Sequence, residues 1–395
     1  MKPKIVGSIL VILGTSIGAG MLALPVATAQ QNFTVTVVML LLCWTLMTAG
    51  ALSLLEVNLW FKPGSNIVSM AKETLGFWGK AVAWFVYFLL LYSLICAYLS
   101  GTGDVLHALL REVGLNVSRS ISTILSLLIL GSIVYTGIGS VDSVNRVLMS
   151  VKLLAFFLLV LMIMPFVHSH LLQQGGFHWH ANTLMVIMTS FGYAIIVPSL
   201  RTYLNSDIVS LKKIILIGSA LPLFIYLIWI VVIQGVLHRG GAHGLLAILH
   251  SSNANSLLLQ KIAMVTHYGW LAVVAKIFVS ICVVTSFLCV SVCLMDFLAD
   301  GLAVKKQGLS GLGLVVGTYS PPLIIVLLFP GIFIHALSYA GICCVALLIL
   351  LPIIMLYVGR YQQLRAQNII LPGGRLLPIV IFLIGLFCFF TSFLS

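Results

Sequence analysis

The chain has 395 residues, of which 61% are hydrophobic and only 7% charged, and its mean hydropathy is +1.21. A water-soluble domain carries about 25% charged residues, so most of this surface cannot face water. The composition therefore excludes a soluble enzyme, a secreted disulfide scaffold and a disordered chain. It predicts a single all-α membrane domain that covers residues 1–395.

Eleven apolar runs are long enough to cross about 30 Å of hydrocarbon as helices, which predicts a polytopic protein with eleven transmembrane helices. The first run lacks a small-residue cleavage site, so we expect it to remain as the first span. In chain order the runs are residues 5–29, 34–57, 81–107, 120–139, 147–167, 183–203, 213–236, 269–297, 311–329, 332–357 and 376–394.

The distribution of Lys and Arg between these runs predicts the orientation, because basic residues gather on the inner side. With the N-terminus inside, the outer side holds only Arg111, Arg119, Arg239 and Lys261, and Lys276 is the one charge deep within a span. The C-terminus then lies outside. The inner side holds the other fifteen basic residues: Lys2, Lys4, Lys62, Lys72, Lys80, Arg146, Lys152, Arg201, Lys212, Lys213, Lys305, Lys306, Arg360, Arg365 and Arg375.

Two spans are unlike the others because they contain residues that break helices. The first has Gly14-Thr15-Ser16-Ile17-Gly18-Ala19-Gly20 and then Pro25, and the sixth has Ser190-Phe191-Gly192-Tyr193 and then Pro198. Glycine destabilises a helix and proline removes a backbone donor. Unwound backbone at membrane depth is tolerated only where protein buries it or a water-filled cavity satisfies it.

The two breaks are five spans apart, so the second copy of the pattern would lie inverted in the membrane. Paired broken helices in two inverted halves indicate the binding site of a secondary transporter. The predicted architecture is two inverted repeats, residues 5–167 and 183–357, followed by an extra helix at 376–394. The alternative is that Gly14-x-x-x-Gly18 only lets neighbouring helices pack closely.

Several motifs resemble one family over nearly the whole length, the bacterial aromatic amino acid permeases, which are tyrosine- and tryptophan-specific transporters. The first-span match runs from Gly14 to Pro25. The other matching segments are Leu54-Leu55-Glu56-Val57, Ala97-Tyr98-Leu99-Ser100-Gly101, Val141-Asp142-x-x-Asn145-Arg146, Thr189-Ser190-Phe191-Gly192, Val197-Pro198-Ser199, Thr285-Ser286-Phe287-Leu288, Asp296-x-Leu298-Ala299-Asp300, Pro321-Pro322 and Tyr339-Ala340-Gly341.

The resemblance implies a leucine-transporter-like fold, as in the wider amino acid, polyamine and organocation transporters. It also implies proton-driven import of aromatic amino acids across a bacterial inner membrane. One position departs from the family pattern. Many members carry a histidine after the Phe-Gly-aromatic motif of span six, where this chain has Ala194 followed by Ile195.

The expected substrate is a zwitterion, and the two breaks offer groups for each of its parts. Backbone N–H groups from Ser16 to Gly20 would bind the carboxylate at a half-helix N-terminus. Carbonyls freed around Gly14 and Thr15, and around Ser190 and Phe191, would bind the ammonium. Phe191, Tyr193 and Tyr98 are candidates for an aromatic slot, with ordinary core or lipid-facing packing as the alternative.

Four side chains are candidates for ion coupling. Thr285 and Ser286 form a hydroxyl pair in span eight, and in sodium-coupled relatives of this fold a comparable pair binds the cation. Such hydroxyls can also simply bond to their own helix. Lys276 would lie on the opposite face of that helix, where it either titrates or extends outward to water. Asp296 would share the face of Thr285, on the inner exit path or paired with Lys305.

The remaining patterns favour transport over other classes. No basic stripe is interleaved with aromatics, so we expect no nucleic-acid partner. The His168/His170 and His178/His180 pairs lack Cys, Asp or Glu partners between spans five and six, so we expect no metal and no cofactor. The sequence shows no nucleophile–base pair, phosphate loop or metal motif, so we expect no enzyme. The resemblance implies that this transporter is a proton symporter for aromatic amino acids, tyrosine first and tryptophan next, surrounded by membrane lipid. The alternatives are a carrier for another neutral amino acid, a sodium symporter, a channel or a membrane-embedded enzyme.

Overall fold

The computed structural model describes residues 3–136, 138–178, 180–241, 244–249, 251, 254–266, 269–302, 304, 308–365 and 369–393. Within these ranges the regular elements are helices, apart from an isolated bridge between Gln31 and Gly176. Eight of the described helices are long and apolar enough to cross a membrane, and a bent pair makes up to nine. The prediction of an all-helical membrane protein is therefore confirmed.

The helices follow the predicted runs in order. They are α1 (Pro3–Ser16), α2 (Ala19–Ala27), α3 (Phe33–Leu59), α4 (Ile67–Glu112), α5 (Arg119–Tyr135), α6 (Ile138–Ile163), η1 (Met164–Phe166), α7 (Ser169–Leu172), α8 (Ala181–Ser190), η2 (Gly192–Ile196), α9 (Val197–Tyr203), α10 (Ile208–Gln234), α11 (Leu245–Leu249), α12 (Ala254–Thr266), α13 (Gly269–Leu302), α14 (Gly308–Leu328), α15 (Phe333–Val345), η3 (Ala346–Leu350), α16 (Leu351–Tyr361) and α17 (Leu376–Thr391).

Two of the predicted spans correspond to shorter helices than expected. The 17 residues of α5 and the 16 residues of α17 fall below the length of the other candidate spans. The predicted span 81–107 is part of a 46-residue helix, α4, which bends at Gly76, where φ is 73°. Eleven spans, two inverted repeats and the orientation stay predictions.

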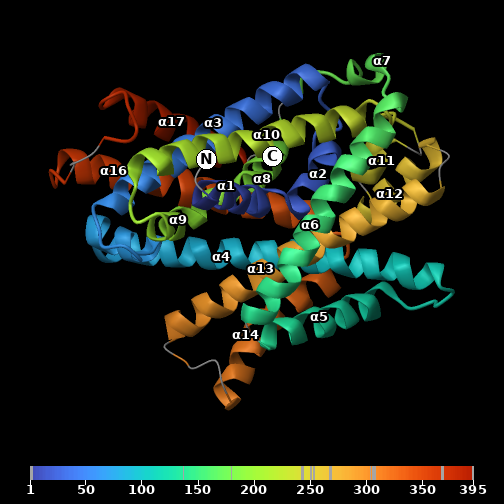
Figure 1. Ribbon diagram of the computed structural model, residues 1–395, viewed down its shortest axis with the longest axis horizontal. Coiled ribbons are helices and arrows are strands. Elements are labelled where there is room, and N and C mark those ends of the chain that lie inside the picture. The colour runs from blue at the N-terminus through green and yellow to red at the C-terminus, as the bar shows by residue number, and fades with distance from the viewer. Residues whose placement is uncertain are drawn as a thin grey trace.

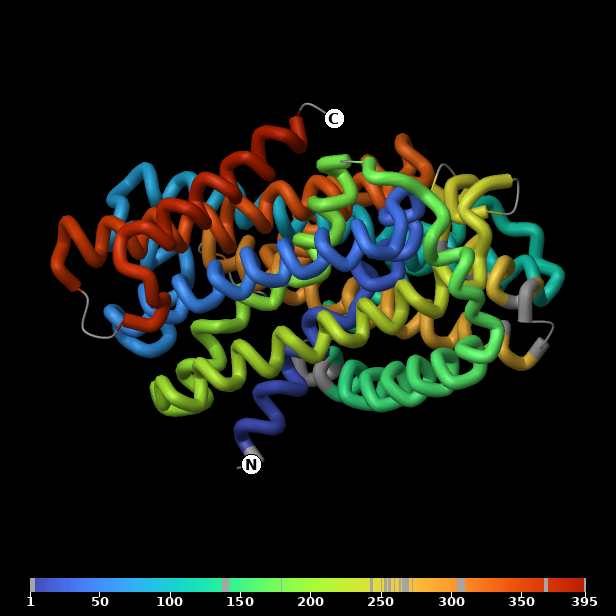
Figure 2. Tube along the Cα trace, turned by 90° about the horizontal axis from the view of Figure 1, so that it is seen from above, coloured from blue at the N-terminus to red at the C-terminus, as the bar shows by residue number. Residues whose placement is uncertain are grey.

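The long helices form an elongated bundle (Figure 1). α3, α4 and α10 run along its length, and α6 crosses them steeply. α13 and α15 both pack against α4 in the middle of the bundle. One end carries α9 and α16, and the opposite end carries α7, α11 and α12. Figure 2 shows α1 and the N-terminus projecting from the side of the bundle.

Polar residues set where several helices begin. The Asn32 side chain accepts a hydrogen bond from the Val35 N–H at 2.9 Å, and Asn66 accepts one from the Ser69 N–H at 2.8 Å. Each of these bonds satisfies a backbone donor that the first helical turn leaves without a partner. Asn32 thereby starts α3, and Asn66 starts α4.

Both predicted breaks are present. α1 and α2 meet at an angle of 52° around Ile17 and Gly18. The sixth span is divided into α8, the short 3₁₀ segment η2 and α9, with Phe191 at the end of α8. The glycines and prolines of these segments therefore interrupt the helices where the sequence predicted.

A buried ion pair holds the α9/α16 end of the bundle together. Arg360 donates from Nε and from an Nη to the two carboxylate oxygens of Glu56, at 2.5 and 2.6 Å. Glu56 also accepts from the backbone N–H groups of Ile370 and Leu371, at 2.7 and 3.1 Å. These bonds join α3, α16 and the segment that leads to α17.

Glycine allows α15 to touch α8 at the backbone. A Cβ atom on Gly341 would lie 2.0 Å from the Met185 carbonyl oxygen. Small residues of this kind let membrane helices approach closely and gain packing contacts. Gly341 is therefore a packing residue between the sixth and tenth predicted spans.

We expect Gly341→Ala to lower the free energy of unfolding by about 1–3 kcal/mol, because the added methyl group must separate the two helices. The measurement is the midpoint of thermal unfolding of the purified protein in detergent. Gly313→Ala is the matched control, since a Cβ atom there meets nothing within 4 Å. Equal midpoints for the two variants would contradict this account of the contact.

Candidate functional site

The two breaks meet at one tyrosine hydroxyl. Tyr226, in α10, lies with its hydroxyl 2.7 Å from the carbonyl oxygens of both Ser16 and Ser190. Its side chain is fully buried. These carbonyls lie at the C-terminal ends of α1 and α8, where a helix provides no further N–H groups to bond to them. A buried carbonyl without a donor is costly. One shared donor therefore ties the first break to the second.

The Ile17 carbonyl, which is next along the first break, accepts a hydrogen bond from a lysine side chain. Lys152 Nζ, from α6, donates to the Ile17 carbonyl at 2.6 Å and to Thr285 Oγ1, in α13, at 3.4 Å. Thr285 in turn donates to the Ile281 carbonyl of its own helix at 2.7 Å. The C-terminal end of a helix attracts a cation, so the ammonium lies where the end of α1 favours positive charge.

This geometry overturns two predictions about charge. Lys152 was predicted to be an inner-side anchor, but only 1% of it is exposed and its ammonium lies inside the bundle. Lys276 was predicted to be the only charge deep within a span, which is wrong because Lys152 is also buried there. The Lys276 side chain is 27% exposed and forms an ion pair with Glu112. A lysine has an apolar stem long enough to serve either role, so hydropathy does not separate them.

The start of α2 lies against α13. The Ala19 N–H donates to Ser286 Oγ at 3.1 Å, and a Cβ atom on Gly18 would lie 2.4 Å from the same oxygen. A Cβ atom on Gly20 would lie 3.0 Å from Ser190 Oγ. A side chain at position 18 would therefore force the Ser286 hydroxyl to move from its place beside the start of α2. The first turn of α2 then presents N–H groups that have no partner within the helix.

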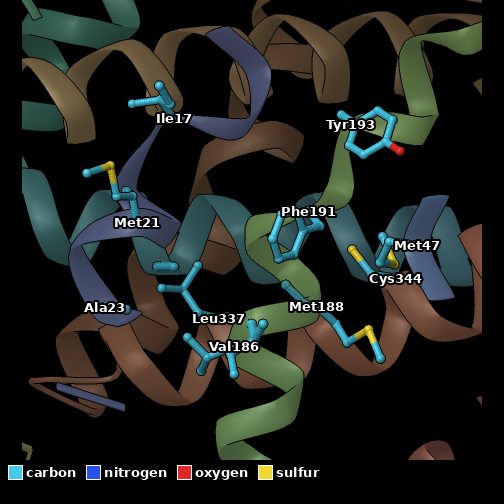
Figure 3. Packing of buried hydrophobic residues seen from close by; sticks show 14 of the residues in the cluster. Ile17, Met21, Ala23, Met47, Val186, Met188, Phe191, Tyr193, Leu337 and Cys344 are labelled. Carbon is cyan, nitrogen blue, oxygen red and sulfur yellow. The ribbon is translucent and has the colours of Figure 1, made fainter. Parts of the chain in front are cut away.

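The three candidate aromatic residues lie in different surroundings. Phe191 is fully buried and contacts the Tyr226 ring edge-on, with centroids 5.1 Å apart. Tyr193 is also buried, but its hydroxyl donates to Thr48 Oγ1 at 3.1 Å in α3. Figure 3 shows this hydroxyl directed away from Phe191 and Ile17. Phe191 therefore belongs to the meeting point of the breaks, and Tyr193 packs towards α3.

The other predicted residues are spread around this meeting point. Tyr98 is buried in α4, and Thr15 is exposed and donates to the Val11 and Ile12 carbonyls of its own helix. A Cβ atom on Gly14 would lie 2.8 Å from the Met149 side chain, and one on Gly192 3.5 Å from Cys344 Sγ. Asp296 is partly exposed in α13, and Lys305, its predicted partner, lies outside the described residues.

Sequence reasoning missed Lys152 and Tyr226, which hold the first break in place. Lys152 carried a signal, since it lies inside the predicted run 147–167. Tyr226 carried none, because nothing in its spacing separates it from the other tyrosines. Among the described residues, no three His, Cys, Asp or Glu side chains come together in a way that could hold a metal ion.

Comparison with known proteins gives a family match over nearly the whole chain. The model of the tryptophan/tyrosine permease family matches residues 1–392. Tyrosine-specific transport system 2 of Haemophilus influenzae is 31% identical over 402 residues, which cover 100% of this chain and 97% of the relative.

Two further relatives carry other substrate names. The tryptophan-specific transport protein of Haemophilus influenzae is 29% identical, over 96% of this chain and 93% of its own length. Glutamine transporter 2 of Aliivibrio fischeri is 28% identical, over 98% of both chains.

We expect Tyr226→Phe to lower the free energy of unfolding by about 1–3 kcal/mol, because two buried carbonyls lose their shared donor. Thermal unfolding of the purified protein in detergent measures this loss. Tyr339→Phe removes the hydroxyl of a tyrosine that is 57% exposed and should change the midpoint little. A Tyr226→Phe protein as stable as the Tyr339→Phe control would show that the hydroxyl does not join the breaks.

Proposed function

Because this chain belongs to the tryptophan/tyrosine permease family, we propose that it imports an aromatic amino acid, tyrosine before tryptophan, by proton symport with alternating access. The family consists of permeases, so the chain is a multi-pass membrane transporter of amino acids and not an enzyme. Tyrosine is placed first because the tyrosine-specific relative has the higher identity, 31% against 29% for the tryptophan-specific one.

The meeting point of the breaks supports binding of a zwitterion. The backbone N–H groups of Gly18 and Gly20, on either side of the Ala19 N–H that donates to Ser286, offer donors and a positive helix end to the carboxylate. Carbonyls beside the breaks offer acceptors to the ammonium, with Tyr226 already bonded to those of Ser16 and Ser190. Phe191 supplies an aromatic face next to Tyr226 for the substrate ring.

The position of the Lys152 ammonium is the observation that favours protons over sodium. Transporters of this architecture bind a coupling cation with carbonyls of an unwound helix and nearby hydroxyl groups. Here the Ile17 carbonyl and the Thr285 hydroxyl both contact Lys152 Nζ. A fixed ammonium at these oxygens repels sodium, whereas a lysine can itself gain and lose a proton. Lys152 is therefore the proposed proton carrier.

The same proposal fixes the placement of the chain in the membrane. We infer eleven spans in the bacterial inner membrane, in two inverted repeats and one extra helix, with the N-terminus in the cytoplasm. The end of the bundle formed by α9, which contains Arg201, and α16, which contains Arg360, is then the inner end. The α7/α11 end is the outer one.

The substrate is tested by competition. We expect unlabelled tyrosine to abolish uptake of labelled tyrosine into proteoliposomes, tryptophan to compete less, and glutamine not to compete at equal concentration. All other natural amino acids serve as controls in the same assay. Stronger competition by glutamine than by tyrosine would replace the proposed substrate with another neutral amino acid.

Coupling is tested with Lys152→Met, which keeps the length and apolar stem of the side chain. We expect it to lower pH-gradient-driven accumulation of labelled tyrosine at least tenfold, because the proton carrier is removed. Exchange of internal for external tyrosine without a gradient should persist, which shows that the variant is folded. Lys276→Met is the matched control and should retain accumulation.

Replacing sodium with choline should leave accumulation by the parent protein unchanged. A strict sodium requirement would reject proton coupling and return Thr285 and Ser286 to the role of a sodium site. Full gradient-driven accumulation by Lys152→Met would likewise reject the proposed proton carrier.

A further inference from the structure

A cavity lies near α7 and α11, where Gln174 follows α7, Leu246 belongs to α11, and Ala29 follows the end of α2. Its volume is about 590 Å³, within the range of about 300–1,000 Å³ typical of small-molecule sites. Arg239, His178, His180, Gln30 and Gln174 line it. The two histidines are exposed, so the cavity is reached from this end of the molecule.

The cavity contains a buried guanidinium that has no anionic partner. Arg239 is only 4% exposed. It donates to the Ala29 carbonyl at 3.1 Å and to Gln234 Oε1 at 3.3 Å, which are both neutral acceptors. Its Nε is buried and has no acceptor, and no carboxylate of the described residues contacts it. Burial lowers the pKa of Arg239 to about 10, so the group still carries its charge at pH 7.

The loop opposite Arg239 is held in a fixed position. Gly175 has a φ of +89°, and a Cβ atom there would lie 2.5 Å from an Nη of Arg239. The Gly176 N–H donates to the Gln30 carbonyl, and Gly176 accepts from the Asn32 N–H, both at 3.3 Å. Gln31 Nε2 donates to the His178 carbonyl at 3.2 Å. The wall of the cavity is therefore built before any ligand binds.

We propose that this cavity is a second binding site, for the carboxylate of a free amino acid that waits at the outer mouth of the transporter. A guanidinium with unused N–H groups is the side chain best suited to a planar carboxylate. The side-chain amides of Gln30 and Gln174 provide acceptors for the ammonium, and the imidazoles provide further polar contacts. The identity of the ligand as the transported amino acid rests on the proposed function. The inference that Arg239 binds a carboxylate in this cavity does not rest on the proposed function.

The site lies one helix away from the breaks. α2 has nine residues, which correspond to about 14 Å, and Arg239 contacts the chain two residues beyond its end. Its first turn carries the N–H groups proposed to bind the carboxylate during transport. A substrate leaving Arg239 would therefore exchange one carboxylate site for another at the opposite end of the same helix.

The test is equilibrium binding of labelled tyrosine to the full-length protein in detergent. We expect two sites per chain in the parent and only one in Arg239→Gln. Because Arg239 also holds the end of α2, Gln174→Trp is a second variant that fills the cavity and leaves the Arg239 hydrogen bonds in place. Gln173→Trp, at an exposed neighbour that does not line the cavity, is the matched control and should keep both sites.

The outcomes separate the cavity from the proposed function. One site in the parent, or two sites in both Arg239→Gln and Gln174→Trp, would overturn the proposal. If tyrosine does not bind but acetate raises the unfolding midpoint of the parent and not of Gln174→Trp, the carboxylate site stands and the proposed substrate fails. An equal rise with chloride or phosphate would identify an inorganic anion and overturn the assignment to an amino acid.

Discussion

Backbone carbonyls that leave a helix inside a membrane need donors, and at the first break Tyr226 and Lys152 supply them. The Ser16 carbonyl accepts a hydrogen bond from the tyrosine hydroxyl at 2.7 Å, and the Ile17 carbonyl accepts one from the lysine ammonium at 2.6 Å. Without such donors, hydrocarbon would make unwound backbone too costly to persist. These two side chains stabilise the bend of 52° between α1 and α2, and with it the position of the buried start of α2.

The two donors at the break differ in charge: one is a neutral hydroxyl group and the other is an ammonium group that can lose a proton. Tyr226 connects Ser16 to Ser190 through a group that stays neutral, so it links the broken spans without a charge. Lys152 instead links Ile17 to Thr285 through a group whose charge depends on a proton. Burying that charge costs free energy that two oxygens offset only in part. The lysine is therefore suited to a coupling role, and the tyrosine to a structural one.

Hydropathy and helix breakers predicted the all-helical bundle and its two broken spans, because long apolar runs must be helical in a membrane and Gly and Pro interrupt them locally. They placed Gly18 and Phe191 at breaks that the structure contains. They did not identify Lys152 and Tyr226 as contacts of the first break. Packing between segments that are distant in sequence decides which face of α6 and of α10 is directed towards the break. The Lys/Arg bias added to this error, because a buried lysine and an anchoring lysine look alike in sequence.

Both ends of α2 are tied to α10 or to the segment that follows it, in addition to the bonds from Thr183 of α8 and to Ser286 of α13. Gln234, the last residue of α10, donates to Thr28 Oγ1 at 2.8 Å, and Arg239 follows with its bond to Ala29. Tyr226, from the same helix, holds the break at the other end of α2. Lys152 is the one donor here that comes from α6, and under proton coupling it is also the one whose charge changes. Its protonation would then act on non-helical backbone at a hinge, while α2 stays attached to α10.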